Sequence, residues 1–261
     1  YDNTTTRLEA FEGGVRSLVR LEDVGPLGGP SPVKPWERIE FVYDDNGDLE
    51  FRYEVRDNGV TNLQAYEGGV LRQKTLTDLG PMGQSSAEKS WERIEFQYDE
   101  TGALEFKYEL YDDGVTVLRS YEGGQLRMVE QTDLGPSGSP SSARNWEQIV
   151  TTFDANGDRE FRYELRDNGV TIETEYEAGV RRVVTQEDRD QFGGTSSVMA
   201  WDSIVTFYDA QGQLSARETI FDNGDVNSFY SNAGDRALRL HYDGDGSHSW
   251  LVRETLYDAH G

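Results

Sequence analysis

Short runs of alternating apolar and polar residues occupy most of the chain, and turns containing glycine separate them. Residues 36–78 hold four such runs, separated by turns at 45–47, 58–59 and 68–69. Period-two alternation bounded by Asp, Asn and Gly predicts β-strands, and Asn-Gly is a strong hairpin signal. No run has the 3.6-residue apolar period of a helix. The pattern therefore predicts an all-β fold built from a four-stranded antiparallel meander.

The meander pattern repeats along the chain, because Trp36 and Trp91 stand 55 residues apart (91 − 36) and begin closely similar segments. A fixed period of this length indicates a tandem-repeat architecture. The fourth repeat is divergent, and its linker is shortened. The predicted organisation is a partial repeat at 1–35, repeats at 36–90, 91–145 and 146–200, a divergent repeat at 201–249, and a partial repeat at 250–261.

The first hairpin of each repeat predicts a strand register. A three-residue loop at 45–47 with glycine in the left-handed region places Phe41 opposite Phe51 on one face. The same count places Glu40 opposite Arg52 on the other face. We therefore expect one aromatic face that forms the core and one solvated face of paired charges.

The second hairpin extends this expectation. A two-residue turn at Asn58-Gly59 would place Phe51 opposite Tyr66 across the strands. Cross-strand aromatic pairs stabilise a sheet by about 0.2–1 kcal/mol each relative to alanine. The corresponding pairs in the next two repeats are Phe106 with Tyr121 and Phe161 with Tyr176.

Two architectures fit such repeats. One is an elongated or spiral array of hairpins, an open tract whose ends do not meet. The other is a five-bladed β-propeller closed by N- and C-terminal strands. Propeller blades pack on each other through both faces, and a face carrying Glu50, Arg52, Glu54 and Arg56 is poorly suited to that packing. The sequence thus favours the array.

Composition narrows the classes of partner. The chain carries 49 acidic against 25 basic residues, for a net charge of −24, and nucleic-acid binding draws on clusters of Lys and Arg. Nucleic acid is therefore not an expected partner. Membrane insertion is not expected either, since no run approaches the length of a transmembrane helix. The absence of cysteine excludes disulfides and thiolate metal sites.

Aspartates at the turns are candidate calcium ligands, because calcium prefers six to eight oxygen ligands. The alternative is that Asp and Asn simply favour turns. The second repeat carries Glu100, Thr101 and Ala103 in its turn, so the ligand set changes between repeats. The candidate metal ligands are Asp44, Asp45, Asp48, Asp154, Asp158, Asp243 and Asp245.

The tryptophans that begin the repeats are candidate glycan-binding residues, because evenly spaced indole rings can stack on sugars. The alternative is that each ring packs on its linker or on a cross-strand arginine such as Arg56 or Arg166 through a cation–π contact. The candidate residues are Trp36, Trp91, Trp146, Trp201 and Trp250.

Catalysis is not expected. The histidines at 241, 248 and 260 form no recognisable nucleophile arrangement, and the pair at 241 and 248 lacks metalloprotease spacing. Paired carboxylates are too frequent in so acidic a chain to indicate glycosidase chemistry.

The strings YDDNGDLEFRYEVRDNG and YDETGALEFKYELYDDG resemble the YD-type repeats of large secreted bacterial proteins. The tryptophan at the start of each repeat resembles the tandem repeats beside hemolysin-type calcium-binding segments in adhesin-like proteins. This resemblance implies an extracellular or cell-surface location. The glycine-rich nonapeptide that binds calcium in such proteins is absent, so the resemblance implies no calcium site.

Three functions remain open. The leading expectation is a non-catalytic structural or adhesive repeat tract of a secreted or cell-surface bacterial protein, with extracellular matrix or cell-surface glycan as its partner. One alternative is a lectin-like module with one glycan pocket per repeat. Another is a self-assembling extracellular filament subunit, since exposed strand edges pair readily with other chains.

Overall fold

The computed structural model describes residues 5–23, 25, 31, 34–78, 86, 89–135, 141, 144–188, 190, 194, 196–232, 236–247 and 252–258. The expected all-β class is confirmed, with nineteen antiparallel strands among these residues. The same residues contain no helix that could serve as a membrane span. The strands are β1 Thr5–Glu12, β2 Val15–Asp23, β3 Trp36–Tyr43, β4 Leu49–Arg56, β5 Thr61–Glu67, β6 Val70–Thr77, β7 Trp91–Tyr98, β8 Leu104–Tyr111, β9 Thr116–Glu122, β10 Gln125–Thr132, β11 Trp146–Phe153, β12 Arg159–Arg166, β13 Thr171–Glu177, β14 Val180–Glu187, β15 Trp201–Tyr208, β16 Leu214–Phe221, β17 Val226–Asn232, β18 Arg236–Tyr242 and β19 Val252–Asp258.

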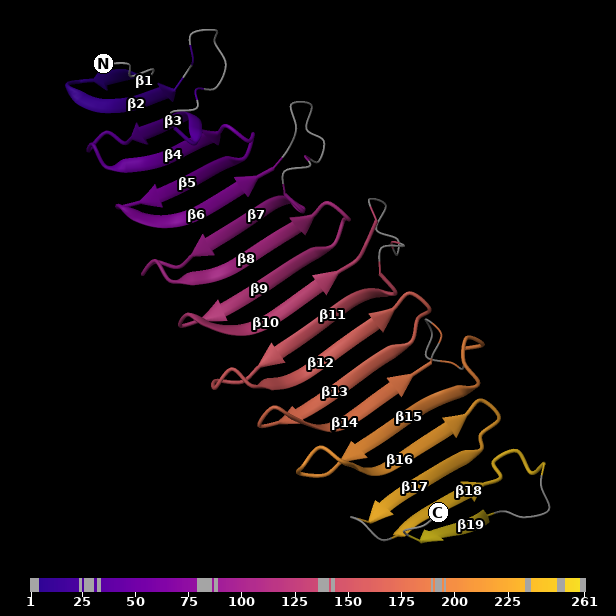
Figure 1. Ribbon diagram of the computed structural model, residues 1–261. Coiled ribbons are helices and arrows are strands. Elements are labelled where there is room, and N and C mark those ends of the chain that lie inside the picture. The colour runs from indigo at the N-terminus through magenta and orange to yellow at the C-terminus, as the bar shows by residue number, and fades with distance from the viewer. Residues whose placement is uncertain are drawn as a thin grey trace. The chain divides into compact units, whose positions relative to one another are not determined.

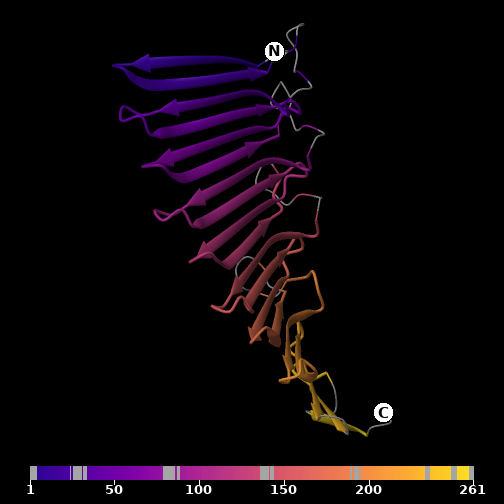
Figure 2. The ribbon, with the colours of Figure 1, turned by 60° about the vertical axis from the view of Figure 1, so that its left-hand side comes forward.

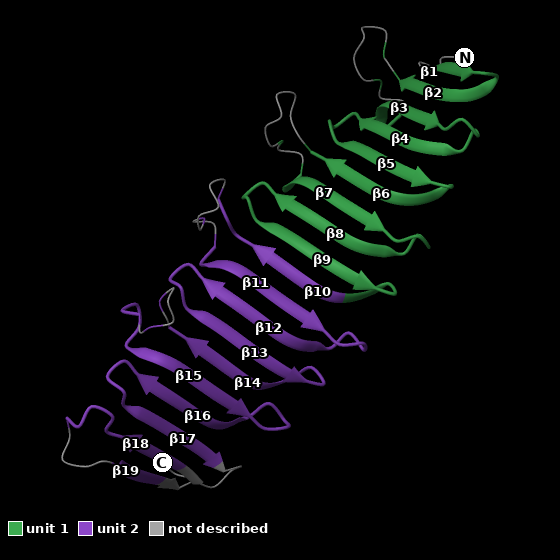
Figure 3. Cartoon of the chain, turned by 180° about the vertical axis from the view of Figure 1, so that it is seen from behind, with its two compact units in different colours: residues 1–126 green, residues 127–261 purple. Residues whose placement is uncertain are grey.

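The chain comprises two units, residues 1–126 and residues 127–261 (Figure 3). Within each unit, strands that follow one another in the sequence pair antiparallel and lie side by side in one layer (Figures 1 and 2). Each unit is thus an open tandem meander of the kind that the turn signals predict.

Pairing continues from one repeat to the next. In the first unit β2 pairs with β3 and β6 pairs with β7 across the linkers, and in the second unit β14 pairs with β15. Separate four-stranded blades would leave these strands unpaired with each other. The propeller alternative is therefore wrong, and the predicted side-by-side stacking of hairpins is confirmed within each unit.

The register of the first hairpin differs from the prediction. The Asp44 amide donates to the Asp48 carbonyl (2.9 Å), and Gly47 has φ of 88°, so the three-residue loop forms as expected. A β-bulge then follows, and it shifts the pairing by one residue. Phe41 consequently lies opposite Arg52, whereas the predicted pairing with Phe51 is wrong.

The second hairpin also differs. The Arg56 amide donates to the Val60 carbonyl (3.0 Å), so the loop contains residues 57–59 and not the two residues predicted. Phe51 therefore lies opposite Ala65, and the expected aromatic pair with Tyr66 does not form. The same loop shifts the later repeats, where the partners are Ser120 for Phe106 and Glu175 for Phe161.

These shifts place apolar and charged residues together on one face, which we call the Ile/Glu face. It is defined by the paired rows through Ile39–Glu54 and Phe41–Arg52 and by their counterparts in the other repeats. Ile39, Glu54 and Ile149 are buried on this face, whereas Phe51 on the opposite face is 38% exposed. The predicted separation into an aromatic core face and a charged solvated face is therefore wrong.

The Ile/Glu face packs within a single layer, so its side chains cover one another sideways. Long Arg and Lys side chains can shield neighbouring apolar groups with their methylene stems. Arg52, for example, lies over the Phe41 ring at 6.0 Å, and Lys107 lies over Phe96 at 5.6 Å. The charged residues of this face are therefore part of its packing.

Candidate functional site

The first aspartate of each long turn is committed to holding that turn. The Asp44 carboxylate accepts hydrogen bonds from the amides of Asn46 and Asp48, both at 2.9 Å. These bonds, with the Asp48 amide first, lower the pKa of Asp44 below its ordinary value. Asp99, Asp154 and Asp209 accept the equivalent bonds in the following repeats.

The candidate calcium ligands in the turns form no group of three close carboxylates among the described residues, and calcium binding there stays a prediction. In the described chain, Asp44, Asp45 and Asp48 do not belong to a group of three carboxylates within ligand distance of each other. The same holds for Asp154 and Asp158. The turn geometry therefore accounts for Asp44 and Asp154 through hydrogen bonds alone.

A fully buried aspartate ends β2 or directly follows β6, β10 and β14, a feature that sequence reasoning missed. The exposed fraction is 0–1% for all four of these residues. Their recurrence at the start of each linker could have indicated a structural role. Acidic residues in linkers are, however, usually exposed to solvent, so burial was not expected. The four, which we call the linker aspartates, are Asp23, Asp78, Asp133 and Asp188.

Each linker aspartate binds the far end of its own linker. Asp133 accepts hydrogen bonds from the Arg144 amide (2.8 Å) and the Ser141 hydroxyl (2.6 Å). Asp78 does the same with the Lys89 amide (2.8 Å) and the Ser86 hydroxyl (2.9 Å). The linker aspartates thus close each linker into a loop just before the next strand.

A cluster of three carboxylates marks the divergent fourth repeat. Asp225, Asp243 and Asp245 bring their ligand atoms within 4.8 Å of each other. Asp243 lies 55 residues after Asp188 (243 − 188) and is the fifth in the linker-aspartate series. Asp225 stands where the three earlier repeats have a buried valine, and sequence reasoning missed it because it lies far from the Asp243-Gly244 motif.

Local bonds hold the cluster together. Asp225 accepts a hydrogen bond from the Gly244 amide (2.8 Å), which is the main cause of its lowered pKa, and lies 3.4 Å from His241 Nε2. The Ser247 hydroxyl likewise lowers the pKa of Asp245. With one ligand oxygen from each carboxylate, the cluster offers three of the six to eight oxygens that calcium takes, so calcium binding at Asp243 and Asp245 stays a prediction.

Charged groups on the Ile/Glu face form compact ion-pair sets in three repeats. Glu54 lies 2.7 Å from Arg52 and 3.0 Å from Arg56. Glu164 binds Arg162 (2.8 Å) and Arg166 (2.9 Å) in the same way. In the second repeat Glu109 pairs with Lys107 and Arg119.

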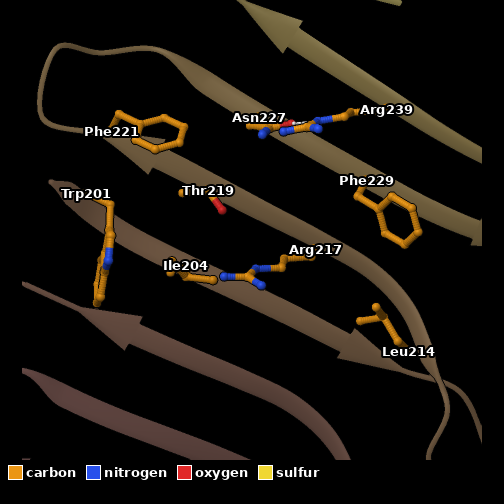
Figure 4. Close-up of a pocket in the computed structure, with 9 residues that line it drawn as sticks. All are labelled: Trp201, Ile204, Leu214, Arg217, Thr219, Phe221, Asn227, Phe229 and Arg239. Atoms are coloured by element: carbon orange, nitrogen blue, oxygen red, sulfur yellow. Dashed lines mark hydrogen bonds between the residues drawn. The ribbon is translucent and has the colours of Figure 1, made fainter. Parts of the chain in front are cut away.

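The structure describes four of the five candidate tryptophans, and glycan binding by them stays a prediction. Trp36 lies opposite Arg56 and Trp146 opposite Arg166, but the cation–π contacts of the described residues involve Phe and Tyr rings rather than indoles. Trp201 lines a hollow of 620 Å³ on the Ile/Glu face of β15–β18 (Figure 4). Trp250 lies outside the described residues, as do the histidines at 248 and 260.

Fold and geometry together define an open, single-layer repeat protein of tandem β-hairpins. No family model matches the sequence, and no curated protein matches it. A Tc holotoxin pore of Photorhabdus luminescens is similar in structure to 94% of this chain, at a TM-score of 0.23 and 12% identity. A TcdB2–TccC3 complex (TM-score 0.21, 10% identity, 92% of this chain) and a porin-like protein of Bacteroides uniformis (TM-score 0.23, 7% identity, 97% of this chain) are also similar.

The chain spans 14% and 16% of the two toxin chains and 95% of the porin-like chain. At these TM-scores and identities the similarity assigns neither a family nor a function to the chain.

Proposed function

We propose that this chain is a structural or adhesive repeat tract of a secreted or cell-surface bacterial protein. The observation that carries the proposal is the pairing of the last strand of one repeat with the first strand of the next, as in β6–β7 and β14–β15. Main-chain hydrogen bonds thereby run through each unit without a break at the linkers. A sheet of this kind can gain or lose repeats without changing its local contacts.

The linker aspartates support a mechanical role. The linker is the longest segment between consecutive strands of a repeat, and Asp78 and Asp133 each bind an amide and a hydroxyl near its far end. When the chain is pulled, these hydrogen bonds would therefore have to break before the linker can extend. The secreted or surface location rests on the resemblance to YD-type repeats.

Single-molecule stretching tests the structural role. Pulling the chain between its ends should release repeats one at a time, each adding about 180–200 Å of extended chain for 55 residues (91 − 36). Removal of one linker aspartate, Asp133→Asn, should lower the force of one step only, and the exposed Asp57→Asn serves as the matched control. Extension with no resisted steps would contradict the proposal.

A further inference from the structure

The fourth repeat carries a hollow whose counterparts in the earlier repeats are occupied by ion pairs. Its position on β15–β18 of the Ile/Glu face corresponds to the place where Glu54, Glu109 and Glu164 sit in the first three complete repeats. Each of those glutamates binds two basic side chains. In the fourth repeat the corresponding residue is Thr219 (219 − 164 = 55), which has no charge.

This single replacement leaves Arg217 without its usual partner. Arg217 is exposed and makes no hydrogen bond or ion pair within the described chain, whereas its counterpart Arg162 binds Glu164 at 2.8 Å. A second guanidinium, that of Arg239, lies across the hollow and its Nε donates only to Asn227 Oδ1 (3.0 Å). Two guanidinium groups therefore face solvent with unused donors.

The two paired rows that hold Thr219, Arg217 and Arg239 contain no acidic residue. The two paired rows of this face from β15 to β19 run Ile204–Thr219–Asn227–His241–Arg253 and Thr206–Arg217–Phe229–Arg239–Thr255. Acidic residues begin in the next row, where Asp225, directly before β17, stands with Asp243 and Asp245. The Asp225 carboxylate already accepts a hydrogen bond from the Gly244 amide and lies 3.4 Å from His241 Nε2. In a chain of net charge −24, these two rows therefore carry only positive formal charge.

Aromatic rings border the two arginines. Figure 4 shows Trp201 and Phe221 at one end of the hollow and Phe229 with Leu214 at the other, with the Arg217 side chain between them. Arginine forks match the geometry of carboxylates and sulfates, and aromatic faces bind flat apolar surfaces such as those of sugar rings. Thr219 and Asn227 add a hydroxyl and an amide within the same lining.

From this arrangement we infer that the hollow binds an acidic saccharide, a sugar ring carrying a carboxylate or sulfate group. The ring stacks on Trp201 or Phe229, and the anionic group is bound by Arg217 and Arg239. Nucleic acid fits less well, because a phosphate at every nucleotide would meet the repulsion of the acidic chain with few basic residues to offset it. The site goes beyond the structural role and does not depend on it, since it belongs to one repeat.

The decisive variant restores the carboxylate of the earlier repeats. Thr219→Glu should pair with Arg217, fill the hollow and weaken saccharide binding about tenfold or more, because hydrogen bonds between charged groups are among the strongest in proteins. Ala216→Glu is the matched control, since it adds the same charge on the same strand but on the opposite face. Arg217→Gln should weaken binding similarly, whereas Arg162→Gln, at the equivalent paired position, should not.

Binding is measured by indole fluorescence and calorimetry on the full chain, with oligogalacturonate, a sulfated oligosaccharide, a neutral oligosaccharide and oligodeoxythymidylate as probes. The expected result is binding of one or both acidic saccharides, with thermal melts showing that every variant is folded. Three results would overturn the inference: no acidic saccharide binds, Thr219→Glu binds as well as the parent chain, or the neutral saccharide or the oligonucleotide binds as tightly as the acidic saccharides.

Discussion

At the scale of single residues, the linker aspartates combine burial with charge. A carboxylate removed from water is stable only when its oxygens are well hydrogen-bonded. Asp133, which is 0% exposed, satisfies this through the Arg144 amide and the Ser141 hydroxyl, so its removal breaks both of these bonds. The same reasoning applies to Asp78, with Lys89 and Ser86 as its donors.

We predict that Asp133→Ala lowers the free energy of unfolding by about 3 kcal/mol, because the fully buried carboxylate is lost and hydrogen bonds to charged groups contribute about 1.5–3 kcal/mol each. Urea unfolding followed by circular dichroism measures the change. The exposed Asp57→Ala is the control and should cost less than about 0.5 kcal/mol. Equal losses in the two variants would show that the buried bonds do not hold the linker.

The turn aspartates give a pH-dependent contribution. The pKa of Asp99 is lowered below its usual 3.8, chiefly by the Thr101 hydroxyl and then by the Ala103 amide. A lowered folded-state pKa means that the charged form stabilises the fold above the usual value, and that this stability is lost as the pH falls through the folded pKa. The window of interest is therefore below 3.8.

We predict that the stability difference between the parent chain and Asp99→Asn shrinks as the pH falls from about 5 to about 3. Thr101→Ala should move the pKa of Asp99 back toward its usual value, since it removes the largest cause of the shift. Carboxyl chemical shifts in an NMR titration measure this pKa directly. An unchanged pKa in Thr101→Ala would contradict the assignment of the cause.

At the scale of strands and hairpins, the sequence predicts the elements well and their pairing poorly. The strand β4 and the loop at 45–47 follow directly from alternation and turn chemistry. The register depends on a bulge opposite Val42 and Tyr43 and on one extra loop residue, Asp57. A one-residue shift moves every side chain to the other face, so a small error in the turn changed the whole predicted core.

The functional residues were predictable to different degrees. Trp201 was predicted from the 55-residue period. The hollow beside it was not, because it lies where Thr219 replaces a glutamate, and the ion pairs that Glu54 and Glu164 make at this position are known only from the structure. Asp225 joins Asp243 through strand pairing across a hairpin, which spacing along the chain does not reveal. The 55-residue period thus identifies residues that differ between repeats, whereas the strand register is needed to identify the residues that they contact.

The ion-pair sets give a prediction for one strand. Glu164, whose side chain is 12% exposed, binds Arg162 and Arg166 along β12. Glu164→Gln should cost about 1–2 kcal/mol, less than a fully buried pair because both guanidinium groups are partly solvated. Chemical denaturation measures the loss, and Glu160→Gln, exposed on the same strand, is the control. A stabilised Glu164→Gln variant would show that desolvation of the carboxylate outweighs its bonds.

At the scale of the whole molecule, a single layer with short-range contacts makes each repeat depend on its neighbours in sequence. Consecutive strands supply nearly all the pairing in each unit. Stability in such proteins is approximately a sum of repeat and interface terms, so a local change can alter one repeat without rebuilding the rest. The fourth repeat can therefore differ at Thr219 and Asp225 while the strand pattern around it continues.

The net charge of −24 destabilises the fold through repulsion between like charges, whereas the ion pairs stabilise it. Added salt weakens both effects, so the two respond to salt with opposite changes in stability. Screening weakens repulsion between exposed like charges, since the Debye length is about 10 Å at 0.1 M, but it affects partly buried pairs such as Arg162–Glu164 much less. Repulsion should therefore dominate, and the melting temperature should rise when sodium chloride increases from about 0.02 to about 0.3 M.

A falling melting temperature would mean that the ion pairs outweigh the net charge. Potassium chloride should give the same rise as sodium chloride, because screening depends on ionic strength rather than on the particular cation. Calcium chloride and magnesium chloride at matched ionic strength extend the comparison to specific binding. A larger rise with calcium, abolished by Asp225→Val, would locate a calcium site at Asp225, Asp243 and Asp245, since that variant restores the valine of the earlier repeats.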